Sequence, residues 1–126
     1  MTPTKEEVYH AFGEVMYAVA MADGSVQAEE NECFNKIIKK HKFGDKIKWS
    51  FYHELKENTP LTHSLNKALD TLCAFGPFED LPFLFNALED IADSFNGIVI
   101  EERKLIDNFR KKLHERFMAD QRFNGY

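Results

Sequence analysis

The chain has 126 residues, 44% of them hydrophobic and 29% charged, and a formal net charge of −5. This length suits one domain, the composition excludes wholesale disorder, and the acidic balance argues against nucleic acid as a partner. The two cysteines, Cys33 and Cys73, are too few for a disulfide scaffold, and no apolar run is long enough to span a bilayer. We therefore expect residues 1–126 to form a single cytoplasmic domain.

The first two predicted elements are helices that a glycine turn separates. Thr4 and Glu7 have the spacing of a capping box, in which each side chain satisfies a free backbone amide at a helix start. Apolar residues then recur at spacings of three and four up to residue 22, which is the period of an amphipathic helix. Asp23-Gly24 ends that helix, and a second helix is predicted from about residue 27 to residue 41.

Four more helices are predicted in the rest of the chain. They cover about residues 45–57, 62–75, 80–95 and 100–117, with breaks at Thr59-Pro60 and Gly76-Pro77. No segment alternates between apolar and polar residues for long enough to predict a strand. The sequence therefore predicts an all-α, single-domain bundle of about six helices.

The fifth and sixth predicted helices repeat the pattern of the first and second. The fifth helix has an apolar stripe whose members each lie 73 positions after an apolar residue of the first: Leu81, Leu84, Phe85, Leu88, Ile91, Ala92 and Phe95. The turn between the helices also recurs, and Glu29-Glu30 corresponds to Glu101-Glu102 at a shift of 72. Two amphipathic helices can be brought into register by chance, but the shared turn and paired glutamates favour duplication of a hairpin. The predicted repeat halves are residues 5–42 and 78–114, joined by the two middle helices.

Charges are sorted into blocks along the chain. Residues 6–35 and 68–102 contain acids without lysine or arginine, whereas bases predominate in residues 36–67 and 103–126. This order predicts one acidic face and one basic face on a helical fold, although ordinary solvated helix faces would give the same pattern. The densest basic stretch, Lys36 to Trp49, has lysines and no arginine, which favours a solvated face over a site for nucleic acid or anionic lipid.

Other patterns point to weaker alternatives. Three polar residues are spaced four positions apart and would share one helix face: Glu6, His10 and Glu14. They would either bind a metal ion or form an ordinary solvated stripe. Phe78 and Phe83 do not fit the apolar stripe of the fifth predicted helix, so either one or both are exposed or they plug the core at the hairpin corner. No phosphate-binding loop, nucleophile motif or zinc motif is present, so we expect a protein that is not an enzyme.

The first turn carries the most specific motif of the chain. It reads Ala22-Asp23-Gly24-Ser25-Val26, with Glu30 four residues after Val26. This segment resembles the TerB-like family of small all-helical bacterial domains named for tellurite resistance, in which such a turn joins two helices. The second turn matches more weakly, through Asn96, Gly97, Val99 and Glu102. The resemblance covers roughly residues 5–114.

The resemblance implies a non-enzymatic part of a bacterial stress-response system. It implies protein partners, and it places Asp23, Glu30 and Glu102 as ligands of a divalent cation. The structural turn residues would be Gly24, Val26, Asn96, Gly97 and Val99. The same carboxylates have a simpler role in capping turns and helix starts, which needs no metal. The leading hypothesis is therefore an interaction or scaffold domain with segregated charges, and the alternative is a sensor or buffer of divalent metal ions.

Overall fold

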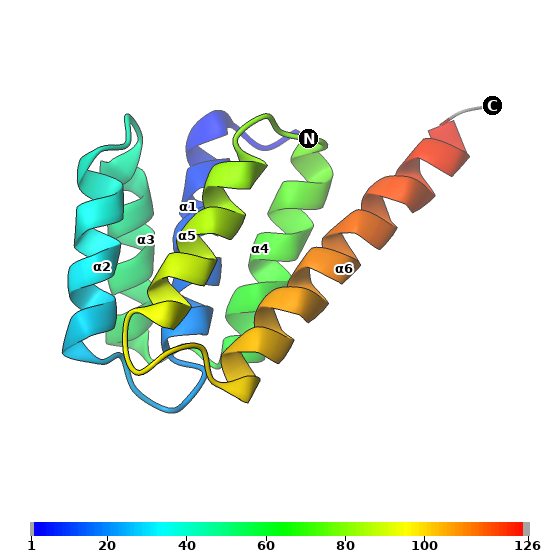
Figure 1. The fold of residues 1–126 in the computed structure, drawn as a ribbon. Coiled ribbons are helices and arrows are strands. Elements are labelled where there is room, and N and C mark those ends of the chain that lie inside the picture. The colour runs from blue at the N-terminus through cyan, green and yellow to red at the C-terminus, as the bar shows by residue number, and fades with distance from the viewer. Residues whose placement is uncertain (1, 125–126) are drawn as a thin grey trace.

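The computed structural model describes residues 2–124 of the chain, and the side chains of residues 2–119. The predicted all-α class is confirmed: the described residues form a bundle of six helices (Figure 1). The helices are α1 (Lys5–Ala20), α2 (Ala28–Lys39), α3 (Gly44–Glu57), α4 (Leu61–Phe75), α5 (Leu81–Asp93) and α6 (Ile100–Asn124).

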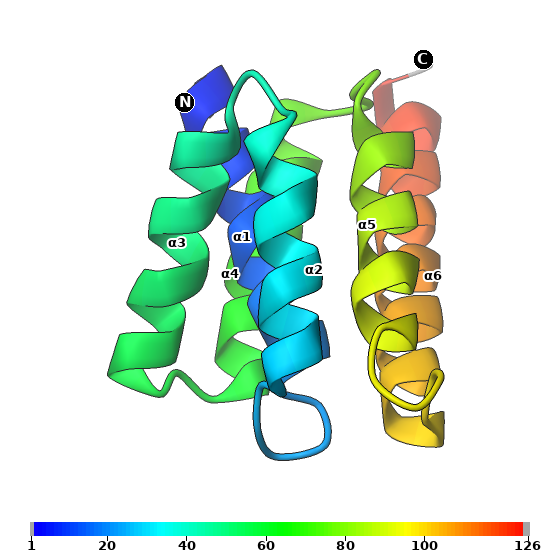
Figure 2. The ribbon, with the colours of Figure 1, turned by 60° about the vertical axis from the view of Figure 1, so that its left-hand side comes forward.

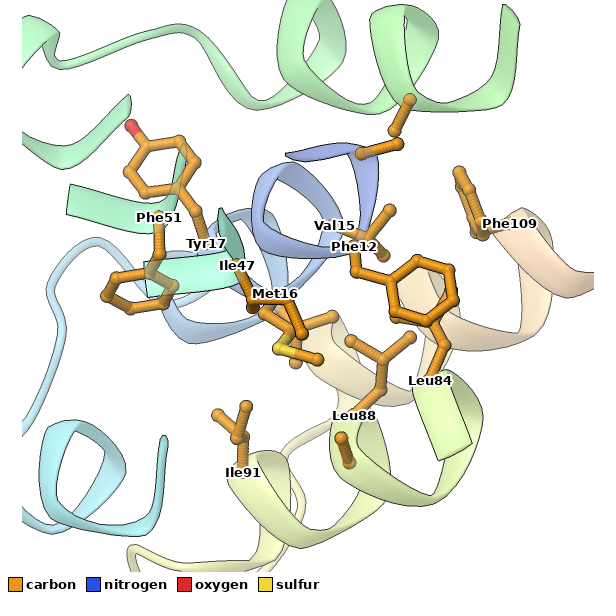
Figure 3. Close-up of a cluster of buried hydrophobic side chains, with 14 of the residues drawn as sticks. Phe12, Val15, Met16, Tyr17, Ile47, Phe51, Leu84, Leu88, Ile91 and Phe109 are labelled. Atoms are coloured by element: carbon orange, nitrogen blue, oxygen red, sulfur yellow. The ribbon is translucent and has the colours of Figure 1, made fainter. Parts of the chain in front are cut away.

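Helix α1 is the centre of the bundle. It packs against α3, α4, α5 and α6, while α2 lies against α3 and α5. Eleven of its sixteen residues are buried, so burial extends well beyond the predicted stripe. Phe12, Val15 and Met16 of α1 meet side chains of the surrounding helices in the core (Figure 3). The start of α1 carries the predicted capping box, because Thr4 and Glu7 exchange side-chain to backbone hydrogen bonds of 3.0 and 3.2 Å.

A glycine allows α1 and α3 to approach closely. A Cβ atom on Gly13 would lie 2.4 Å from the carbonyl oxygen of Ile47 and 2.9 Å from the Cβ of Ser50. The hydroxyl of Ser50 in turn donates a 2.6 Å hydrogen bond to the carbonyl oxygen of His10. Any larger residue at position 13 must therefore separate the two helices.

The connections alternate between the two ends of the bundle. The loops that join α1 to α2 and α5 to α6 lie at one end, which we call the carboxylate end (Figures 1 and 2). The loop between α2 and α3, residues 40–43, lies at the opposite end with the α4–α5 loop. The two predicted repeat halves thus place their Gly turns at the same end of the molecule.

The aromatic residues near Gly76-Pro77 pack onto the core. Phe78 and Phe83 are half-buried, and their rings lie 6.0 and 6.2 Å from the ring of Phe12. Phe78 also meets Tyr9 and Phe75 edge to face, with centroids 5.7 and 5.2 Å apart. Of the two alternatives drawn from the sequence, exposure is therefore wrong and the core role is the one observed.

Candidate carboxyl-pair site between the two glycine turns

The two turns at the carboxylate end have the backbone geometry that their glycines predict. Gly24 has φ +106° and Gly97 has φ +81°, in the left-handed region where a side chain causes strain. Asn96, which precedes Gly97, has φ +56°, and asparagine tolerates this region better than most residues. Val26 and Val99 lie just after the turns and are half-buried, and Val26 packs against the core.

Each turn leads into a helix that a buried glutamate caps. The Oε1 atom of Glu30 accepts a 2.8 Å hydrogen bond from the backbone N–H of Gln27, which precedes α2. The Oε1 atom of Glu102 accepts a 3.0 Å bond from the N–H of Val99, which precedes α6. Both glutamates are only 2% exposed, although each lies in the first turn of its helix. The predicted capping role is therefore present at both turns.

The structure also brings the two capping glutamates into contact with each other. The carboxyl groups of Glu30 and Glu102 are within hydrogen-bonding reach, although they belong to different predicted repeats. Loss of water around Glu30 raises its pKa to about 7, and the contact with Glu102 acts in the same direction. Two carboxyl groups this close cannot both stay ionised at low cost, so Glu30 keeps its proton to a higher pH than an ordinary glutamate.

Asp23, the third predicted metal ligand, acts on this pair only through its charge. It is exposed, and its Oδ1 atom is 3.5 Å from the backbone nitrogen of Ser25 within the turn. Its negative charge adds to the rise in the pKa of Glu30. Among the residues that the structure describes, no group of three or more histidine, cysteine, aspartate or glutamate side chains is arranged to hold a metal ion. The site is therefore a buried pair with a nearby third charge.

A second buried acidic group, which the sequence analysis missed, lies among α1, α3 and α4. Glu54 is 2% exposed and accepts hydrogen bonds from Lys67 Nζ and Thr59 Oγ1. Lys67 also lies 3.3 Å from Glu14 Oε2, and burial raises the pKa of Glu14 to about 7. Here the positive charge of Lys67 offsets the negative charge of the two carboxylates, whereas no such ion pair is found for Glu30 or Glu102 among the described residues. Only the fold assembles this group, because its members come from three helices.

The predicted stripe of Glu6, His10 and Glu14 does not form a cluster. Glu6 lies 3.6 Å from Lys46, Glu14 pairs with Lys67, and the ring of His10 lies 5.3 Å from that of Trp49. Each side chain thus has its own partner from another helix, because α3 and α4 flank α1 on this side. Neither alternative describes the whole stripe, because Glu6 is exposed whereas His10 and Glu14 are partly buried against α3 and α4.

His41 is the remaining histidine with defined contacts at both ring nitrogens. Its Nδ1 accepts a 2.9 Å hydrogen bond from the backbone N–H of Phe43, so its Nε2 carries the hydrogen and donates to Asp80 at 2.8 Å. The hydroxyl of Tyr9 donates to the same Asp80 oxygen at 2.8 Å. This group ties the α2–α3 loop to α1 and to the α4–α5 loop, and neither ring nitrogen is left to act as a base.

Each end of the bundle carries charges of both signs: Glu6, Asp45 and Glu79 are exposed near the α2–α3 loop, and Lys56 and Lys104 are exposed at the carboxylate end. The exposed carboxylates Asp23, Glu29 and Glu101 lie around the Gly turns, whereas Lys39, Lys40 and Lys42 surround the α2–α3 loop. Among residues 2–124, no helix is both long enough and apolar enough to cross a membrane. Comparison with family models, curated proteins and solved structures finds no match to this chain.

Proposed function

We propose that this chain is a non-enzymatic helical domain that binds a divalent cation at the Glu30–Glu102 pair. The observation that carries the proposal is the contact between these two buried carboxyl groups, one from each predicted repeat. Two carboxylates buried side by side cost free energy, so binding of a positively charged species to the pair is favourable. A proton binds the pair at low pH, and a cation can replace the proton at higher pH.

The donor chemistry favours a hard cation. Carboxylate oxygens are the preferred ligands of Ca²⁺, Mg²⁺ and Mn²⁺, and water molecules commonly complete the coordination of such ions. Each glutamate gives one oxygen to the backbone amide of its own helix start, which fixes the orientation of the carboxyl group. Asp23, whose charge already acts on Glu30, would add a further negative charge. Binding of an ion would thus be coupled to both Gly turns at once.

The chain offers matched controls for a direct test of this proposal. Calorimetric titration with Ca²⁺, Mg²⁺ and Mn²⁺ at about pH 8 would compare the wild type with Glu30→Gln and Glu102→Gln. Glu29→Gln and Glu101→Gln change the same charge at the neighbouring exposed positions. We expect loss of binding in the first two variants and retention in the other two. Equal loss in all four would mean that only the general acidic surface attracts the ion.

A second function, an interaction domain with one acidic and one basic cluster, is favoured by a different observation. Asp23, Glu29 and Glu101 are exposed around the Gly turns, and Lys39, Lys40 and Lys42 around the α2–α3 loop, which suits an adaptor between two partners of opposite charge. Charge reversal at Glu29 and Glu101 should abolish such an interaction without touching the buried pair. Membership in the TerB-like family, and a role in a tellurite-resistance-like stress response, stay predictions from the two turns.

A further inference from the structure

Lysines without an acidic partner gather at the end opposite the carboxyl pair. Lys36, Lys46 and Lys67 each lie within 4.0 Å of a carboxylate oxygen. Within the part of the chain that the structure describes, no such ion pair is found for Lys39, Lys40, Lys42 or Lys48. These four exposed lysines flank the α2–α3 loop; Lys42 Nζ lies 5.7 Å from the centroid of the Phe43 ring, and no carboxylate of the described residues neutralises any of the four charges.

Three of these lysines line one hollow. It has a volume of about 400 Å³ and lies where α2 ends and α3 begins. Lys39, Lys42 and Lys48 contribute to its walls, together with Asn35, Gly44 and Asp45. Three lysines and one acid, Asp45, are among the lining residues, so their side chains carry a net charge of +2 with His41 neutral. A concave site of this size fits a small ligand, and its charge favours an anion.

The loop beneath the hollow is held in place before any ligand arrives. A Cβ atom on Gly44 would lie 2.1 Å from the carbonyl oxygen of Ile38, so the end of α2 and the start of α3 are in direct contact. His41 is fixed by hydrogen bonds at both ring nitrogens, as described above. Because the backbone is already ordered, a ligand has to immobilise only the lysine side chains, which lowers the entropic cost of binding.

We propose that this hollow binds a small phosphate-bearing anion through Lys39, Lys42 and Lys48. Lysine ammonium groups bind phosphate oxygens as point charges and donate charge-assisted hydrogen bonds to them. A long polyanion is a poorer fit, because it would have to pass over a chain whose net charge is −5. The site is separate from the carboxyl pair and does not depend on the function proposed for that pair.

Pyrophosphate is a suitable probe, titrated into the intact chain by calorimetry with a chelator present to exclude metal ions. We expect Lys39→Ala, Lys42→Ala and Lys48→Ala each to weaken binding roughly tenfold, as loss of one charge-assisted contact implies. Lys104→Ala and Lys111→Ala are matched controls, since these exposed lysines also lack an acidic partner in the described part of the chain. We expect the controls to change the affinity less than about twofold.

Three results would overturn the proposal. The first is no measurable binding of pyrophosphate at millimolar concentration. The second is an equal loss of affinity in the hollow variants and the α6 controls, which would indicate general charge attraction. The third is tighter binding of a short oligothymidylate, or of vesicles that contain phosphatidic acid, than of pyrophosphate. Thermal unfolding of every variant would verify folding, which we expect to be unchanged because all five lysines are exposed.

Discussion

The carboxyl group of Glu30 meets that of Glu102 in the interior, while each caps the helix that it begins. One glutamate therefore makes a local contact within its own hairpin and a distant contact with the other hairpin. The local contact satisfies a backbone amide that a helix start leaves free. The distant contact confers no stability when both groups are ionised, so stability at this end of the bundle depends on what neutralises the pair.

The raised pKa of Glu30 predicts that stability falls as pH rises above about 4.5. Glu30 has a folded-state pKa of about 7, against an ordinary value of 4.5, so between these values the folded state holds more protons than the unfolded state. The free energy of unfolding should then fall by up to about 1.4 kcal/mol per pH unit for each such group. Thermal unfolding between pH 4.5 and 8 would measure this slope.

Two variants separate the contributions to this slope. Glu14 has a pKa of about 7 as well, so Glu14→Gln and Glu30→Gln should each remove part of the slope. At pH 8, Glu30→Gln should be at least as stable as the wild type, because it removes the repulsion and keeps an oxygen for the Gln27 amide. The lowered pKa values of Glu7, Glu54 and Glu89 act below pH 4.5, where protonation of these groups destabilises the fold. An unchanged slope in Glu30→Gln would contradict the raised pKa.

The close approach of α1 and α3 predicts that substitution of Gly13 lowers the free energy of unfolding more than substitution of Gly24. Gly13→Ala places a methyl group against the backbone of Ile47 and should lower the free energy of unfolding by about 2–3 kcal/mol. A Cβ atom on Gly24 would meet no atom within 4 Å, so the cost of Gly24→Ala is backbone strain of about 1–2 kcal/mol. Urea denaturation of both variants would measure the difference. A Gly13→Ala protein as stable as Gly24→Ala would mean that the helices are not in contact there.

The buried ion pair between Lys67 and Glu54 predicts a strong effect of removing the lysine. Lys67→Met leaves Glu54 charged and 2% exposed without its cation, which should cost about 3 kcal/mol. Lys36→Met is the matched control, because Lys36 and its partner Glu32 have side chains that are 75% and 68% exposed. Exposed pairs of this kind contribute less than about 1 kcal/mol. Similar losses in the two variants, measured by urea denaturation, would contradict the inferred burial of Glu54.

The fold could be predicted from the sequence because its signals are local. The three-and-four spacing of apolar residues, the Thr4–Glu7 capping box and the glycine turns each act within one helix or one turn. The arrangement around α1 could not be predicted in the same way. Gly13, Tyr17 and Ala20 lie outside the apolar stripe, and they are buried because other helices surround α1 on several sides.

The candidate site could be predicted only in part, for a similar reason. The repeat placed Glu30 and Glu102 at equivalent helix starts, but spacing along the chain says nothing about the distance between two hairpins. Asp23 has the same motif support as Glu30, yet it is exposed. The Glu14–Lys67–Glu54 group had no sequence signal at all, because three helices each contribute one member.

The proposed function requires a proton and a divalent cation to compete for the Glu30–Glu102 pair. The most direct measurement is the thermal midpoint with and without Ca²⁺, Mg²⁺ or Mn²⁺, at pH 5.5 and at pH 8. A cation at a hundred times its dissociation constant should add about 2.7 kcal/mol at pH 8, which raises the midpoint by several degrees. We expect that rise to shrink at pH 5.5 and to vanish in Glu30→Gln. No rise with any of the three ions at pH 8, or an equal rise in Glu30→Gln, would contradict the account.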